Sequence, residues 1–207
     1  MISRVDVEEF EADMILQERP IRERVHRKRR MTVDSFERFL HLPENHGRLY
    51  ELINGEVVEK MPTEEHGTIV INIGSAIKTH TRQRGQGRVG TEVRYRLLHE
   101  RFDSRQPDLS YVSEYRPAVT QGAVPHMPDL VVEVQSPDDT VRSMRERAHY
   151  FVANGVKLVW LVFPRKRYVE VYSPDREMEI IFGGDSLLGG DVIPGFSMPI
   201  VEVFDDL

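Results

Sequence analysis

Residues 128–135 have the sequence Pro-Asp-Leu-Val-Val-Glu-Val-Gln, and this stretch decides the fold. Its apolar and β-branched run, Leu130–Val134, predicts a strand that is buried on both faces. Residues 138–154 predict a helix that Gly155 closes, and residues 157–163 predict a second buried strand. Because strand, helix and strand follow one another, we expect a βαβ crossover with two parallel strands and a helix over the sheet.

The segments on either side of this crossover extend the sheet. Residues 49–60 predict a hairpin, because Asn54-Gly55 accepts the positive φ angles of a tight turn. Residues 64–84 place apolar side chains three and four positions apart, which predicts a helix. Alternating apolar residues predict further strands at 90–98, 107–113, 168–172 and 177–181. The expected fold class is α/β or α+β, with a mixed sheet flanked by helices.

The first 30 residues differ in composition from the rest of the chain. They are highly charged, and Pro20 interrupts any single helix across them. From Met31 onward an apolar pattern begins, and Thr32 or Asp34 can cap a short helix. We therefore expect a charged N-terminal extension over residues 1–30 and one domain over residues 31–207.

The composition excludes several classes of protein. A chain of 207 residues with 40% hydrophobic and 30% charged residues has the balance of a globular domain rather than a disordered one. The absence of cysteine excludes disulfides, thiolate zinc sites and cysteine nucleophiles, and it favours a cytoplasmic location. The apolar runs are far too short to cross a bilayer, so we expect no membrane partner.

The charge distribution bears on nucleic-acid binding. A formal net charge of −6 argues against binding through overall charge. The region before the domain nevertheless contains a basic run that could bind phosphates, and a solvated helix or arm is the alternative. The basic residues of this run are Arg22, Arg24, Arg27, Lys28, Arg29 and Arg30.

Two similar Pro-Asp elements carry candidate functional residues. Asp108 and Asp129 each follow a proline at the start of a predicted strand, and each could alternatively cap a bend. Glu133 and Gln135 share one face of the second strand. A glutamate inside such a strand is costly to bury unless it is hydrogen-bonded, paired with an arginine or bound to a metal ion. Since Mg²⁺ prefers carboxylate oxygens, we expect a Mg²⁺ (or Mn²⁺) site with Asp108 and Glu133 as ligands.

Four blocks of the sequence, in order, resemble the bacterial Uma-two family of restriction endonucleases within the PD-(D/E)XK nuclease superfamily. The resemblance covers about residues 31–205 and implies a restriction-endonuclease-like core and metal-dependent hydrolysis of DNA. The blocks are RLYELINGEVVEKMPTEEHGTIVINI (48–73), RQPDLSYVSE (105–114), PDLVVEVQSPDDT (128–140) and RERAHYFVANGVKLVWLVFPRKRYVEVYSP (145–174).

The resemblance also implies roles for individual residues. Asp108 matches the first acid of the motif and Glu133 the second, whereas Gln135 stands where the family's lysine would be. A neutral amide can orient a water only by hydrogen bonds. A lysine displaced onto the next helix would fall at Arg147, whose permanent charge prevents it from acting as a base. Lys78 is a further candidate, and a solvated helix lysine is its alternative.

Three more residues are candidates for the same site. Glu51 matches a block in which an early glutamate adds a metal contact. His66, at the start of the predicted helix, could contact phosphate or fix the site, or could make only a local hydrogen bond. Asp129 could hold the metal ligands in position without contacting the ion itself.

Three functions remain open at this stage. The first is a Mg²⁺-dependent endonuclease that cuts DNA. The second is a catalytically impaired nucleic-acid-binding or regulatory module that keeps the nuclease fold, which Gln135 and Arg147 favour. The third is a structural oligomer whose acids form only salt bridges. Nucleases that cut both strands are often two-fold dimers, so we expect DNA as the partner and a homodimer as the assembly.

Overall fold

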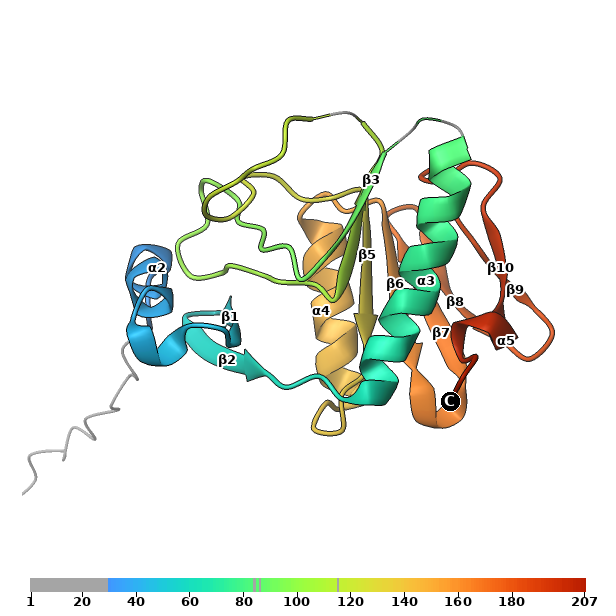
Figure 1. The fold of residues 1–207 in the computed structure, drawn as a ribbon, viewed down its shortest axis with the longest axis horizontal. Helices are drawn as coiled ribbons and strands as arrows, with labels where there is room; N and C mark the ends of the chain where they lie inside the picture. The colour runs from blue at the N-terminus through green and yellow to red at the C-terminus, as the bar shows by residue number, and fades with distance from the viewer. Residues whose placement is uncertain (1–29, 84, 86, 115) are drawn as a thin grey trace, which may run out of the picture.

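The computed structural model describes residues 30–207 except residues 84, 86 and 115. Its centre is a six-stranded mixed sheet with the order β3-β4-β5-β6-β7-β8 (Figure 1). Only β5 and β6 pair in parallel; the other neighbours are antiparallel. The strands are β3 Arg88–Thr91, β4 Leu109–Val112, β5 Leu130–Val134, β6 Leu158–Phe163, β7 Tyr168–Ser173 and β8 Arg176–Phe182. The expected mixed sheet and its βαβ crossover are therefore confirmed.

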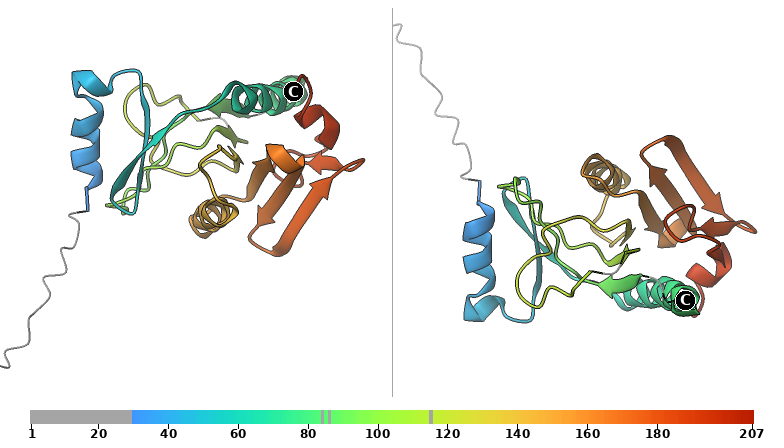
Figure 2. Two further views of the ribbon diagram at one scale, coloured as in Figure 1. Left: turned by 90° about the horizontal axis from the view of Figure 1, so that it is seen from below. Right: turned by 90° about the horizontal axis from the view of Figure 1, so that it is seen from above.

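Helices cover both faces of this sheet, as Figure 2 shows from below and from above. On one face lie α3 (Glu64–Gln83) and the short α5 (Ile200–Val203), which pack on Leu109, Leu130 and Trp160. The other face is covered by α4 (Val141–Ala153), whose apolar side chains pack on β5 and β6. Outside this sheet lie two short 3₁₀ helices, Pro43–Asn45 and Pro164–Lys166, and the antiparallel pair β9 Ser186–Leu188 with β10 Ser197–Pro199.

A separate hairpin lies beside the end of the sheet. It consists of β1 (Leu49–Ile53) and β2 (Glu56–Lys60), and α2 (Val33–Leu40) packs on it. Asn54 and Gly55 have φ angles of 51° and 81°, which confirms the expected tight turn. Thr32 is the cap of α2, since its side chain accepts a hydrogen bond from the Ser35 amide.

Two predicted boundaries are wrong. The helix over residues 138–154 begins only at Val141, because the side chains of Thr140 and Ser143 form a reciprocal capping box there. The strand over residues 90–98 ends at Thr91, because Glu92 adopts a φ of 52° and turns the chain out of the sheet.

The described part of the chain contains no helix that is long and apolar enough to cross a membrane. Residues 1–29, with most of the basic run, lie outside the described residues. The division into an extension and a domain therefore stays a prediction.

Candidate metal centre

The candidate site lies where β4 begins and β5 ends. The antiparallel register pairs Leu109 with Val132, and continuing it by one position sets Asp108 opposite Glu133. Directly opposed residues in such a pair have Cβ atoms about 5 Å apart and share a face, here the face that α4 covers. The backbone amide of Val134 donates to Asp108 Oδ2 over 2.7 Å, which ties the two strand ends together.

Asp108 is surrounded by hydrogen-bond donors. His66, in the first turn of α3, places Nε2 2.9 Å from Oδ2, and Lys60 Nζ lies 2.5 Å from Oδ1. Burial alone would raise the pKa of Asp108, but the charge of Lys60 and the hydrogen bond with His66 outweigh it and lower this pKa to about 2. Asp108 is therefore ionised, and both of its oxygens have partners.

Lys60 is the last residue of β2, and its side chain is only 10% exposed. Besides Asp108, its ammonium contacts the Gln106 carbonyl at 2.8 Å and Glu92 Oε2 at 3.2 Å. Burial lowers the pKa of Lys60, but the surrounding carboxylates, Asp108 foremost, outweigh it and raise this pKa. Lys60 is thus a charged group that is surrounded by oxygen atoms.

Glu133 is fully buried, and only one of its two carboxylate oxygens has a partner among the described residues. Its Oε2 pairs with Arg147 Nη1 at 3.2 Å, whereas its Oε1 has no hydrogen-bond partner among the described residues. Burial is the main cause that raises the pKa of Glu133 to about 8; the charge of Asp108 adds to it, and Arg147 and Lys60 oppose it. A carboxyl with this pKa is poised between its neutral and charged forms near neutral pH.

Glu51 brings a third buried carboxylate from the hairpin. Its Oε1 accepts a 2.6 Å hydrogen bond from the Gln106 amide, and its Oε2 has no partner in the described part of the chain. Glu51 lies opposite Val58 in the hairpin register. Lys60 is two residues after Val58 in β2, so the side chains of Glu51 and Lys60 lie on the same face of the hairpin. The hairpin therefore places a carboxylate, Glu51, and an ammonium group, Lys60, near the start of β4 and the end of β5.

Arg147 and Gln135 both contact Asp139, in the turn before α4. Arg147 links Glu133 to Asp139, at 3.2 Å from each. The Gln135 amide donates to the Asp139 carbonyl over 3.0 Å, in the turn before α4. On the other side of α4, Arg145 pairs with the buried Glu170 of β7. Two ion pairs thus fix α4 on the sheet, one of them through Glu133.

Two of the expected residues lie away from this cluster. Asp129 follows the same Pro-Asp motif as Asp108, but β4 and β5 are antiparallel, so the two strand starts lie at opposite ends of the sheet. Asp129 pairs there with Lys157 and Ser113, about 13 Å along β5 from Glu133. Lys78 is exposed on α3, about 18 Å along the helix from His66.

Sequence reasoning did not single out Lys60 or Glu92. The information for Lys60 was present, because a turn at Asn54-Gly55 fixes the hairpin register and places Lys60 on the face of Glu51. Glu92 has no comparable indication: it reaches Lys60 only because its unusual φ angle turns the chain beside Asp108. Burial raises the pKa of Glu92.

The donor set suits a hard divalent cation. Within residues 30–207, outside the three gaps, no three His, Asp or Glu side chains are already arranged to hold a metal ion. The cluster nevertheless has two unpartnered buried carboxylate oxygens, Glu51 Oε2 and Glu133 Oε1, beside the ionised Asp108. Carboxylate oxygens are the ligands that Mg²⁺ and Mn²⁺ prefer. The residues therefore fit such an ion.

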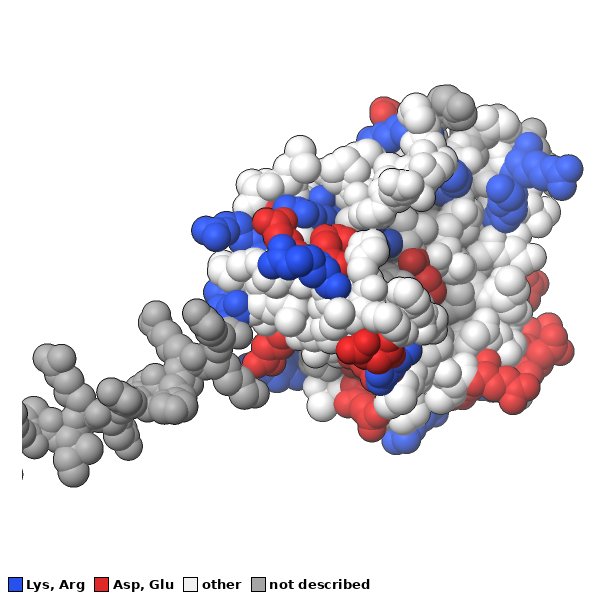
Figure 3. Space-filling model, turned by 60° about the vertical axis from the view of Figure 1, so that its left-hand side comes forward, with Lys and Arg blue, Asp and Glu red and all other residues white. Residues whose placement is uncertain are grey.

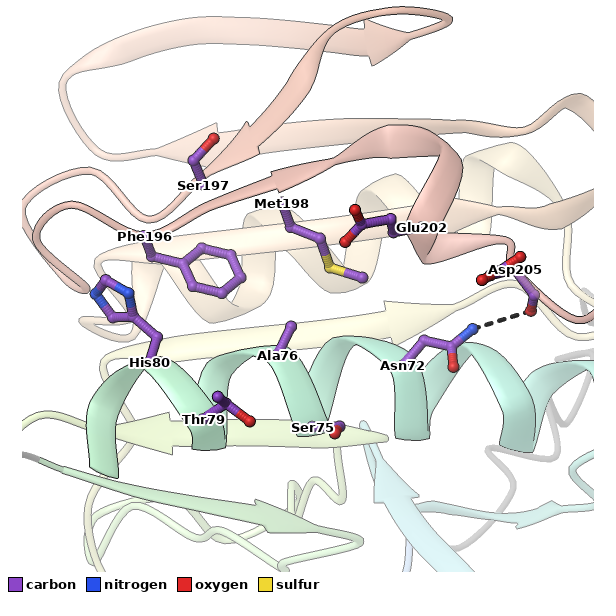
Figure 4. A pocket seen from close by; sticks show the side chains of 10 residues that line it. All are labelled: Asn72, Ser75, Ala76, Thr79, His80, Phe196, Ser197, Met198, Glu202 and Asp205. Atoms are coloured by element: carbon purple, nitrogen blue, oxygen red, sulfur yellow. Dashed lines mark hydrogen bonds between the residues drawn. The ribbon is translucent and has the colours of Figure 1, made fainter. Parts of the chain in front are cut away.

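The hairpin side of the surface and the pocket beside α3 differ from this cluster of buried acids. On the hairpin side of the molecule, basic and acidic side chains are interspersed (Figure 3), and ion pairs such as Arg94–Glu37 and Arg48–Glu59 form there. A pocket of about 600 Å³ lies between α3 and the segment that runs from β10 to α5 (Figure 4). Its lining includes Asn72 and His80 but none of the clustered acids.

Comparison with known proteins defines the class. A mixed sheet with helices on both faces and facing acids at the strand ends is the arrangement expected of a restriction-endonuclease-like nuclease. The chain belongs to the Uma2 family, described as "putative restriction endonuclease", whose model matches residues 36–201.

Among the solved structures that match, we compare one that is similar over most of both chains. It is the crystal structure of a "putative nuclease belonging to DUF820" from Anabaena variabilis ATCC 29413. The TM-score is 0.70 at 25% sequence identity, and the match covers 84% of this chain and 97% of that chain. No curated protein sequence matches this chain significantly.

Proposed function

We propose that this protein is a metal-dependent nuclease that hydrolyses phosphodiester bonds of DNA, with Glu51, Asp108 and Glu133 as the residues that hold a Mg²⁺ or Mn²⁺ ion. One observation carries the proposal: Glu51 Oε2 and Glu133 Oε1 are buried beside Asp108 with no partner among the described residues. An unpaired buried carboxylate oxygen is costly, and a cation between these side chains would remove that cost.

The chain's own residues would perform defined tasks around the ion. When bound, a divalent ion would stabilise the negative charge that develops on the phosphate and make an attacking water more acidic. His66 and the Val134 amide hold Asp108 Oδ2, so Asp108 keeps one orientation. Arg147 holds Glu133 Oε2 and leaves Oε1 without a partner among the described residues. Contacts with the protein thus fix the orientation of both carboxylates.

The test compares two acids that follow the same Pro-Asp motif. We expect Mn²⁺ to bind the wild type in isothermal titration calorimetry, and Asp108→Asn and Glu133→Gln to lose that binding and any cleavage of duplex or single-stranded DNA. Asp129→Asn is the matched control and should retain both, because Asp129 lies at the other end of β5. Unchanged Mn²⁺ affinity in both site variants would refute the proposal.

A second candidate is a nucleic-acid-binding module that keeps the nuclease fold without cleaving. It is favoured by Gln135, which bonds to the turn before α4, and by Arg147, which already neutralises Glu133. Binding of Mn²⁺ and of DNA without cleavage under any metal condition would support this candidate over the first. A homodimer that sets two such sites across a duplex belongs to the same proposal.

A further inference from the structure

The surroundings of Lys60 Nζ resemble those of a bound metal ion. Three oxygens contact this ammonium: Asp108 Oδ1 at 2.5 Å, the Gln106 carbonyl at 2.8 Å and Glu92 Oε2 at 3.2 Å. Two carboxylates and a backbone carbonyl are also a donor set that a hard divalent cation uses. The side chain that places the ammonium there is 10% exposed, so few water molecules can replace these oxygens.

Neither oxygen of Asp108 is without a partner while Lys60 is in place. Its Oδ2 is occupied by His66 Nε2 at 2.9 Å and by the Val134 amide at 2.7 Å. Its Oδ1 faces Lys60. A divalent ion that takes Asp108 as a ligand must therefore replace the Lys60 ammonium at Oδ1. Two cations at one carboxylate oxygen would repel each other strongly in a buried site.

Glu133 does not have this restriction. Arg147 occupies only its Oε2, and Oε1 has no partner among the described residues. The same holds for Glu51, whose Oε2 is unpartnered there. An ion can therefore reach an oxygen of Glu51 or Glu133 without displacing a partner. At Asp108 it must displace the Lys60 ammonium, so this contact limits binding of the ion.

We propose that the Lys60 ammonium is a built-in competitor for the divalent ion, so that the ion binds Asp108 only when Lys60 leaves it. This inference rests on the metal-dependent function proposed above. In the metal-free protein Lys60 neutralises Asp108 and Glu92, which keeps the acidic cluster folded. When an ion binds, it takes over that neutralisation, and the ammonium moves away from Asp108. The affinity of the site for metal is lower than its carboxylates alone would give, because each binding event breaks the Lys60 contacts.

The first experiment measures Mn²⁺ affinity by isothermal titration calorimetry on the full chain, after the metal has been removed with a chelator. We expect Lys60→Met to bind Mn²⁺ about tenfold more tightly than the wild type or more, because the ion no longer displaces an ammonium. Lys78→Met is the control with the same charge change on exposed α3, and its affinity should equal that of the wild type. Equal or weaker binding by Lys60→Met overturns the inference.

The second experiment uses the wild type and so does not depend on folding of a variant. Lysine acylation, followed by mass spectrometry, reports how accessible each ammonium is. We expect Lys60 to react slowly in chelator and at least several-fold faster at saturating Mn²⁺, while the rate at Lys78 stays constant. Saturation with Mn²⁺ that leaves Lys60 equally protected overturns the inference.

The two proposals fail in distinguishable ways. If neither the wild type nor Lys60→Met binds Mn²⁺, the metal-dependent function itself is refuted, and this inference with it. If both bind equally, and Asp108→Asn abolishes binding, the function stands and only the competition by Lys60 is refuted. Binding by Lys60→Met but not by the wild type supports both, with the site closed by Lys60 under those conditions.

Discussion

Arg147 and Glu133 form a buried ion pair that uses only one of the two carboxylate oxygens. Arg147 Nη1 lies 3.2 Å from Glu133 Oε2, and the side chains are 15% and 1% exposed. The pair has two consequences, since it docks α4 on β5 and fixes the rotation of the carboxylate whose Oε1 has no partner among the described residues. If the proposed function holds, stability and metal affinity depend on the same contact.

Replacing Arg147 by methionine should destabilise the fold. Removing one member of a buried pair typically costs 3–5 kcal/mol, and we expect about 3 kcal/mol, the low end, because the raised pKa keeps much of Glu133 protonated near neutral pH. Urea unfolding in chelator measures the change. Arg142→Met on the same helix is the control: its pair with Glu146 is exposed, so the free energy of unfolding should hardly change. A similar, small effect for both variants would contradict the prediction.

The pH dependence of the free energy of unfolding should reveal the raised pKa of Glu133. In the folded protein its pKa is raised from the ordinary 4.5 to about 8, so between these values the folded state binds one more proton than the unfolded state. Stability from this group is therefore full below about pH 4.5 and is lost as pH rises through 8, with a slope of at most about 1.4 kcal/mol per pH unit. The lowered pKa of Asp108 has the opposite effect on the pH dependence of stability. The stabilisation from Asp108 is lost only as pH falls through about 2.

The measurement is the difference in unfolding free energy between the wild type and Glu133→Gln from pH 5 to pH 8, without metal. We expect the wild type to lose stability relative to the variant as pH rises. Glu146→Gln, an exposed acid on α4, should track the wild type. A pH-independent difference would show that Glu133 keeps an ordinary pKa in the folded protein.

The sequence predicted those parts of the site that depend on local pattern. The run Leu130–Val134 identified the central strand, and its period of two placed Glu133 on one face. The twin Pro-Asp motifs placed both Asp108 and Asp129 at the start of a strand, but the pairing direction of β4 and β5 separates them. Strand direction is a property of the assembled sheet, so a motif at a strand start cannot carry it.

Other features depend on contacts between distant segments. Lys60 and Asp108 are far apart in the sequence and meet only because the hairpin packs at the end of the sheet. The Gln135 side chain turns toward the Asp139 carbonyl because the residues before α4 form a turn that the helical pattern did not reveal. Such tertiary contacts override local preference, and for this reason Lys60 was missed while Gln135 stood out.

His66 should act on metal binding as a positioning residue. Its Nε2 holds Asp108 Oδ2 from the first turn of α3, and it is itself 5% exposed. Groups that orient a metal ligand typically contribute 10- to 100-fold to metal affinity, so we expect His66→Gln to weaken Mn²⁺ binding by about tenfold. The control is His80→Gln near the other end of α3, where the ring contacts the Pro194 carbonyl. Equal Mn²⁺ affinity in both variants would mean that Asp108 is oriented without His66.

The hairpin turn should matter both for stability and for the site. At Gly55, φ is +81°, and a Cβ would lie 2.6 Å from Arg30 Cβ, where Arg30 Nε donates to the Asn54 carbonyl. Gly55→Ala therefore adds a steric collision to the cost of a positive φ, which alone is about 1–2 kcal/mol. Gly122→Ala is the matched control, because Gly122 has a φ of +72° and a Cβ there would meet no described atom within 4 Å.

We expect Gly55→Ala to lose about 1 kcal/mol more than Gly122→Ala in urea unfolding. Because the hairpin carries Glu51 and Lys60, a shift of the turn also moves two charged groups of the acidic cluster. Mn²⁺ affinity should therefore change in Gly55→Ala and stay constant in Gly122→Ala. If both variants lose the same stability and bind Mn²⁺ like the wild type, the turn and the acidic cluster are uncoupled, and the hairpin only supports α2.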